Sequence, residues 1–211
     1  MTYFDYVRNL ENFVKEYKKL MEETKILKQR HYFEDKLDSF YTHLGDSLLM
    51  VEYNLGSARD HPDYSPKEFK QKEFQDTCNR HSNGVKSYRR ELEMYKEQIK
   101  DQEFIDNGTM SGQEFKRKLL EFKDEFQKII SEITRKVGNM WNPKYAGEIG
   151  IRHELEEKIK QINNVLPKDD FFAKSNDRTY RSIYIKFKNI LVRNKSIWED
   201  MKRQSEKERT F

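Results

Sequence analysis

A seven-residue repeat of apolar side chains over residues 66–103 constrains the fold more than any other feature of the sequence. Its members follow one another at alternating steps of four and three residues, and they are Phe74, Cys78, His81, Val85, Tyr88, Leu92, Tyr95 and Ile99. Such spacing keeps one apolar seam facing a partner helix. We therefore predict one long helix over 66–103, with Ser65 as its cap and Pro66 at its first position. The triplet 82–84, which contains Gly84, is a weak point, but the repeat keeps its phase across it and favours continuity.

The N-terminal region, residues 2–55, shows the same kind of periodicity. The clearest apolar face in it consists of Phe33, Leu37, Phe40, Leu44, Leu48, Val51 and Leu55. No glycine or proline lies between the two halves of this region, so a single helix and a break near 29–31 are both compatible with the pattern. Gly56 and Ser57 are predicted to end the region.

Three further helices are predicted after the long one. Residues 112–137 repeat the heptad and are expected to pack against the long helix as an antiparallel hairpin. Residues 151–166 end before Pro167, and residues 177–204 follow. The predicted fold is all-α, an elongated antiparallel bundle of five to six helices built from coiled-coil-like hairpins. Its regions are an N-terminal helical region (1–57), a long hairpin (65–137) and the C-terminal helices (151–211), all in one extended domain.

The composition agrees with long helices that bury narrow apolar stripes. Charged residues make up 37% of the chain and apolar residues 35%, which is too little apolar surface for a thick core. The apolar residues are periodic and the charges nearly balanced, so disorder is not expected. Cys78 is the sole cysteine, and the sequence has neither a signal-peptide core nor a membrane-spanning stretch. We therefore expect a cytoplasmic protein in a reducing environment.

The last predicted helix carries an unusual concentration of positive charge. Residues 167–211 hold 12 basic and 7 acidic side chains, and no acidic residue occurs between Arg178 and Trp198. The cations that flank its apolar face are Arg178, Arg181, Lys186, Lys188, Arg193 and Lys195. This pattern suits nucleic-acid phosphates, a lipid surface or an acidic protein groove. The alternative is a solvated face whose cations pair with the acidic N-terminal half of the chain.

Residues 138–150 form the longest predicted break between helices and contain two large aromatic residues, Trp141 and Tyr145. Loops held by rigid elements often carry binding residues, so this pair is a candidate contact for a protein partner. The alternative is that both rings fold back and cover one end of the bundle.

Two segments invite a search for chemistry, and a structural reading accounts for each. The passage 106–115 resembles part of a calcium-binding loop, but Ile105 falls at a ligand position, and Ser111 with Glu114 explains the passage as a turn followed by a helix cap. Cys78 and His81 lie close together, but both occupy core positions of the repeat, and the sequence completes no zinc site. We therefore predict no catalytic residue, no metal and no cofactor.

Three functions remain in order of preference. The first is a non-enzymatic protein-interaction module, an adaptor, regulator or inhibitor that docks through helix faces and the aromatic loop. The second is a nucleic-acid-binding protein that uses the basic final helix, and the third is a peripheral membrane-associated bundle. Self-association into a homodimer is a further expectation, because thin bundles often complete their core by pairing.

Overall fold

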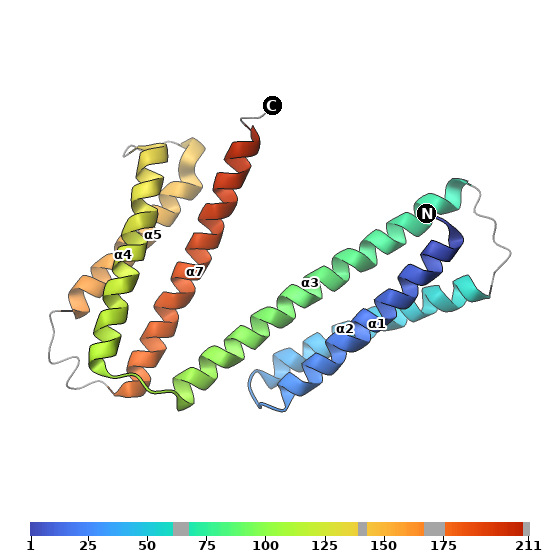
Figure 1. Ribbon diagram of the computed structural model, residues 1–211, viewed down its shortest axis with the longest axis horizontal. Helices are drawn as coiled ribbons and strands as arrows, with labels where there is room; N and C mark the ends of the chain where they lie inside the picture. Colours follow the sequence, from blue (N-terminus) through green and yellow to red (C-terminus); the bar gives the residue numbers. More distant parts are fainter. Residues whose placement is uncertain (61–67, 139–142, 167–175, 209–211) are drawn as a thin grey trace. The chain divides into compact units, whose positions relative to one another are not determined.

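The computed structural model describes residues 1–60, 68–138, 143–166 and 176–208. In these ranges the chain forms six α-helices and one short 3₁₀ helix, with no strand, which confirms the predicted all-α class and the number of helices (Figure 1). The chain divides into two compact units, Met1–Gln102 and Glu103–Phe211. Each unit is described by itself below.

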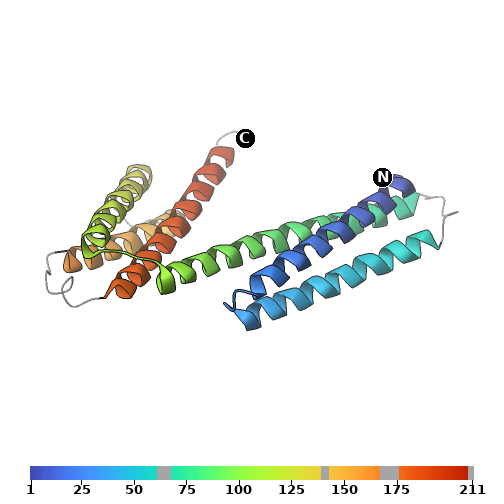
Figure 2. The ribbon, with the colours of Figure 1, turned by 60° about the horizontal axis from the view of Figure 1, so that its bottom comes forward.

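Unit 1 is a three-helix bundle of α1 (Tyr3–Lys28), α2 (Glu34–Arg59) and most of α3 (Glu68–Asn107). Arg89 pairs with Glu16, and Lys96 donates to Glu23 at 2.7 Å, both with the same separation of 73 residues. A constant separation means that α1 and α3 run parallel. Helix α2 runs antiparallel to both, and Figure 2 shows α1 and α2 lying along α3.

The core of unit 1 is formed by the predicted seams. Phe40 and Leu44 of α2 and Leu92 and Ile99 of α3 are almost completely buried. Helix α3 passes through residues 82–84 without interruption, which confirms the predicted continuity. Gly84 allows α1 to pack closely against α3 at this point, because a Cβ atom at position 84 would lie 2.8 Å from the hydroxyl oxygen of Tyr17. The predicted cap of α3 at Ser65 and Pro66 lies outside the described residues.

The N-terminal region is two helices, which settles the alternative left open by the sequence. Between α1 and α2 the backbone turns through left-handed conformations at His31 (φ 59°) and Phe33 (φ 55°). Both residues carry side chains that disfavour this conformation, so the break has no glycine or proline signal. The predicted end at Gly56 was wrong, because α2 continues to Arg59 and the Asp60 amide donates to the Gly56 carbonyl at 3.0 Å.

Unit 2 contains α4 (Gly112–Val137), the 3₁₀ helix η1 (Pro143–Tyr145), α5 (Ala146–Val165) and α7 (Asp177–Glu208), together with the end of α3. Glu125 of α4 pairs with Lys195, and Glu132 pairs with Lys202, so α4 and α7 run parallel. Helix α5 lies between α4 and α7 in the sequence and runs in the opposite direction to both. Unit 2 therefore repeats the up–down–up order of unit 1.

Two predicted boundaries in unit 2 differ from the structure. The predicted break reached residue 150, but α5 already begins at Ala146. Gly147 lies inside this helix and admits Met201 of α7, whose Cε atom would be only 2.6 Å from a Cβ atom at Gly147. Helix α7 extends beyond the predicted residue 204 to Glu208.

The helices of the predicted 65–137 hairpin contribute to different cores. The repeat of α3 packs into the core of unit 1, whereas Phe115, Leu119 and Phe126 of α4 pack with α5 and α7 in unit 2. The boundary between the units, at 102/103, falls within this predicted region. None of the helices in the described ranges has an apolar stretch long enough to cross a bilayer.

Candidate functional site

Two of the six candidate cations of α7 hold the end of α3. Arg181 is buried, and its Nε and Nη2 atoms lie 2.9 and 2.7 Å from the carbonyl oxygen of Ile105. Its Nη1 atom lies 2.7 Å from a carboxylate oxygen of Asp177. The exposed Arg178 donates to Asp106 at 2.9 Å. A guanidinium group that satisfies a carbonyl at a helix C-terminus has a structural role, since the last carbonyls of a helix lack partners within it.

The other candidate cations lie further along α7. Arg193 pairs with Glu154 of α5, and the ammonium nitrogen of Lys195 lies 3.6 Å from Glu125 of α4. Lys188 is half-buried and also interacts with a neighbouring group. Lys186 is exposed and has no ion-pair partner among the described residues.

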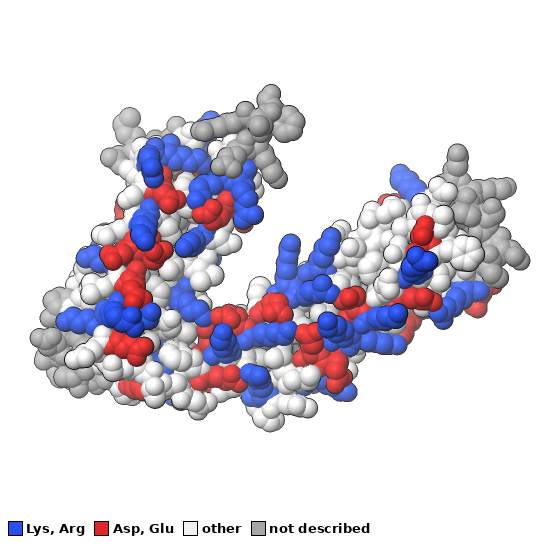
Figure 3. All heavy atoms as spheres, viewed as in Figure 1, with Lys and Arg blue, Asp and Glu red and all other residues white. Residues whose placement is uncertain are grey.

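The carboxylates that pair with these cations belong to unit 2 itself, not to the N-terminal half of the chain. Figure 3 shows basic and acidic side chains lying side by side on the visible face of both units. Exposed ion pairs stabilise a protein by only about 0–1 kcal/mol, so they can open. Opening one for a phosphate would nevertheless leave a carboxylate next to the phosphate and oppose its binding.

The aromatic pair of the predicted loop is only partly described. Trp141 lies outside the described residues. Tyr145 is half-buried at the end of η1, and the ammonium nitrogen of Lys144 lies 5.7 Å from its ring centroid. The predicted partner contact at Trp141 and Tyr145 therefore stays a prediction.

Cys78 and His81 belong to the core of unit 1, at the positions that the repeat predicts. Both are buried, and His81 Nε2 lies 3.3 Å from the side-chain nitrogen of Asn54. Burial, and secondarily the charge of Arg80, lowers the pKa of His81, while burial raises the pKa of the Cys78 thiol. The site thus favours a neutral imidazole and a neutral thiol, which is the opposite of an activated thiolate with its base.

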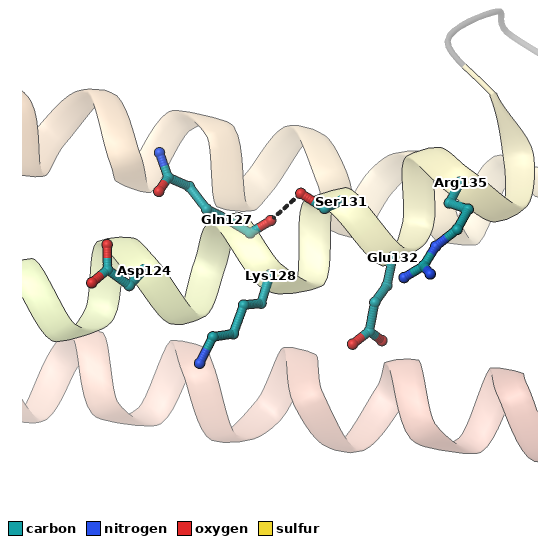
Figure 4. Close-up of a pocket in the computed structure, with 6 residues that line it drawn as sticks. All are labelled: Asp124, Gln127, Lys128, Ser131, Glu132 and Arg135. Carbon is teal, nitrogen blue, oxygen red and sulfur yellow. Dashed lines mark hydrogen bonds between the residues drawn. The ribbon is translucent and has the colours of Figure 1, made fainter.

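The hollow shown in Figure 4 lies along α4 and has a volume of about 370 Å³. Three of its polar side chains already have partners. Ser131 donates to the carbonyl of Gln127 at 2.8 Å, Lys128 donates to Glu125 at 2.7 Å, and Glu132 accepts a hydrogen bond of 2.8 Å from the Trp198 indole. No histidine or cysteine is among its described lining residues, which are Asp124, Gln127, Lys128, Ser131, Glu132 and Arg135.

A surface that the sequence analysis missed lies on α2. Leu49, Met50 and Tyr53 are exposed by 65, 58 and 73%, respectively. In residues 37–58 only Asp38, Asp46 and Glu52 are charged, although charged residues make up 37% of the whole chain. Two of these three carboxylates are already paired with α1, Asp38 with Lys28 and Glu52 with Lys18.

This surface has its own seven-residue repeat, on the side of α2 opposite the core. We define the outer face of α2 as the exposed residues Ser39, Thr42, Asp46, Leu49, Met50, Tyr53 and Gly56. Apart from Met50, these residues alternate in steps of three and four, as in a coiled-coil seam. The signal was present in the sequence, but Ser39, Thr42 and Asp46 are polar and concealed it.

The chain matches no protein-family model, no curated protein and no solved structure. The surfaces themselves are therefore the basis for a functional proposal.

Proposed function

We propose that this chain is a non-enzymatic protein-interaction module, an adaptor, regulator or inhibitor that docks through helix faces. The observation that carries the proposal is the outer face of α2, where Leu49, Met50 and Tyr53 are exposed side by side with a single charged residue, Asp46, among them. Clustered exposed apolar side chains in an otherwise highly charged surface are typical of a binding site for another protein. The 141–145 loop is a second proposed contact.

The basic face of α7 supports nucleic-acid binding less well. Arg178, Arg193 and Lys195 pair with carboxylates of their own unit, and the buried Arg181 is occupied by a backbone carbonyl. A phosphate-binding surface gains affinity from cations that are available to release counterions. Most of this face would first have to exchange its present partners.

The proposal is tested by capture from a cell extract, with and without nuclease treatment. We compare the wild-type chain with Met50→Glu, which places a charge on the outer face of α2. The matched control is Met94→Glu on α3, because Met94 and Met50 are both exposed by 58% and lie in the same unit. The proposal is supported if a partner protein is still captured after nuclease treatment and by the Met94→Glu variant, but is no longer captured by the Met50→Glu variant.

A second variant examines the alternative function. Arg178→Glu/Lys186→Glu/Lys195→Glu reverses three exposed cations of α7 and leaves the buried Arg181 in place. If all capture depends on nucleic acid and disappears with this variant, the chain is a nucleic-acid-binding protein and the proposed function is wrong. Binding to phosphates would also weaken steeply with salt, whereas apolar docking would change little.

A further inference from the structure

We propose that the outer face of α2 binds α2 of a second copy of this chain, in an antiparallel dimer with its two-fold axis between Leu49 and Met50. The inference rests on the proposed function, because it names the partner of the same face. In a two-fold interface each residue i contacts residue j of the other copy, and j contacts i. A single helix face can therefore serve as both partners only if it is complementary to itself.

The distribution of side-chain size along the face meets this condition. The large side chains Leu49, Met50 and Tyr53 lie near the proposed axis, and Gly56 follows them toward the C-terminal end of the face. A Cβ atom added at Gly56 would meet nothing within 4 Å, so the surface there is open. An antiparallel partner places Leu49 opposite Met50 of the second copy at the centre and Gly56 opposite the exposed His43, so the open space at the glycine can receive the imidazole ring. The seven-residue spacing lets two such helices contact along their length at a shallow angle.

The distribution of charge also fits a second copy. The face contains no lysine or arginine, and its single carboxylate is Asp46. In the proposed register Asp46 lies opposite Tyr53 of the second copy, whose hydroxyl group can donate a hydrogen bond to a carboxylate. The two Asp46 carboxylates are about 10 Å apart along the axis, because seven residues separate positions 46 and 53 at about 1.5 Å each.

Other registers are less favourable. Moving the axis to Asp46 itself would place the two carboxylates directly opposite each other, and like charges in contact oppose association. Moving the axis to residue 48 would place Asp46 against Met50 of the second copy, which removes water from the carboxylate without supplying a donor. The arrangement centred between Leu49 and Met50 avoids both costs.

The size of the face sets the expected strength of the dimer. From Ser39 to Gly56 the face is about 26 Å long and about 10 Å wide. Two such strips bury on the order of 500 Å² in total, well below the roughly 1,200 Å² at which standard stable interfaces begin. We therefore expect a weak, reversible dimer with a dissociation constant of about 0.1–1 mM, not an obligate one.

Sedimentation equilibrium of the purified full chain tests the dimer without any other molecule present. The wild type is expected to pass from monomer to dimer with rising concentration, and Met50→Glu is expected to weaken the dimer by about tenfold or more, because a carboxylate would be desolvated at its centre. Met94→Glu adds the same charge at an equally exposed methionine and is expected to leave dimerisation unchanged. A wild type that stays monomeric into the millimolar range overturns the proposal, as does equal weakening by both variants.

Disulfide trapping tests the register. Chains with Asp46→Cys and chains with Tyr53→Cys are oxidised separately and then as a mixture. Only the mixture is expected to form a covalent dimer, because positions 46 and 53 of different copies lie opposite each other. Identical positions of the two copies lie about 10 Å apart, and a disulfide tolerates at most roughly 7 Å between Cα atoms. Cross-linking of each single variant to itself as efficiently as in the mixture contradicts the antiparallel register. The native Cys78 is buried and present in every sample.

The failure of this inference can be told apart from the failure of the proposed function. A chain that is monomeric in sedimentation but captures a protein that Met50→Glu releases is an interaction module with a different partner on α2. A chain that is monomeric and captures only nucleic acid contradicts both proposals.

Discussion

The middle helices of the two units, α2 and α5, have the same place in similar three-helix bundles but very different outward surfaces. Helix α2 presents Leu49, Met50 and Tyr53 to solvent. The exposed stripe of α5 has the same three- and four-residue steps but consists of Gly150, His153, Glu157, Lys160 and Asn164. Both helices bury an apolar seam on their inner side, so the bundle does not require the difference. The outward side of α2 is therefore free to serve binding, whereas that of α5 keeps the polar surface usual for a solvated helix.

The two units also differ in how they satisfy buried polar groups. Unit 1 pairs side chains between helices, as His81 does with Asn54 and Ser47 with Tyr88 at 3.0 Å. Unit 2 uses buried arginines that donate to backbone carbonyls, Arg181 to Ile105 and Arg152 to Gly138 at 2.9 Å. Unit 2 also pairs side chains between helices, as Asn194 does with Glu154 at 3.1 Å, so the difference between the units lies in the two buried arginines.

The largest predicted loss of stability comes from removing one buried phenylalanine ring from the core of either unit. Phe40→Ala in unit 1 and Phe126→Ala in unit 2 each remove a phenyl ring with at most 2% exposure, which costs about 3–5 kcal/mol of unfolding free energy. Both tryptophans lie in unit 2, so tryptophan fluorescence reports on that unit while circular dichroism reports on both. Phe126→Ala should move the fluorescence transition, and Phe40→Ala should move only the dichroism transition.

This experiment tests whether the two units unfold independently. If Phe40→Ala lowers the fluorescence midpoint as much as Phe126→Ala does, the two units unfold cooperatively and the comparison between them as separate bundles is wrong.

A smaller effect is expected from removing a buried arginine. Arg181→Met deletes the donors to Ile105 and leaves its carbonyl unsatisfied, so we expect unit 2 to lose about 2–3 kcal/mol. Arg178→Met, three residues earlier, removes an ion pair from a side chain that is 67% exposed and should cost less than about 1 kcal/mol. Urea unfolding followed by tryptophan fluorescence measures both. Equal costs for the two variants would contradict a special role for Arg181.

The neutral pair in unit 1 predicts a pH dependence that unit 2 should not share. Because burial lowers the pKa of His81 below the ordinary histidine value of about 6.5, the unfolded chain binds a proton that the folded chain does not, and stability falls as the pH drops below about 6.5. Thermal melting followed by circular dichroism at pH 7.5 and 5.5 should show this loss, whereas melting followed by tryptophan fluorescence, which reports on unit 2, should not. His81→Gln should reduce it, since glutamine does not titrate. An unchanged loss in His81→Gln would assign the effect to other groups.

The heptad steps are a local property of the sequence, and for that reason they predicted the helices and the apolar seams correctly, including the uninterrupted passage through Gly84. Contacts between distant residues were not accessible in the same way. Arg181 and Ile105 are 76 residues apart, and nothing near Arg181 in the sequence distinguishes a buried carbonyl-binding arginine from an exposed phosphate-binding one. The sequence allowed a break near 29–31 but could not select it, because the break places ordinary residues in a conformation that usually marks glycine.

The smallest predicted effect concerns this break, where the same substitution is expected to change the unfolding free energy in opposite directions in the two units. His31 and His153 both have exposed side chains, 82 and 67%, but His31 has a left-handed backbone in unit 1 and His153 lies inside α5 in unit 2. Glycine relieves strain at the first position and weakens the helix at the second. We therefore expect His31→Gly to raise the unfolding free energy of unit 1 by up to about 1 kcal/mol, and His153→Gly to lower that of unit 2 by about 1 kcal/mol. Urea denaturation measured by circular dichroism and fluorescence separates the two, and a loss of stability in both variants would show that the turn at His31 is held by its side chain, which contacts Glu34 at 2.7 Å.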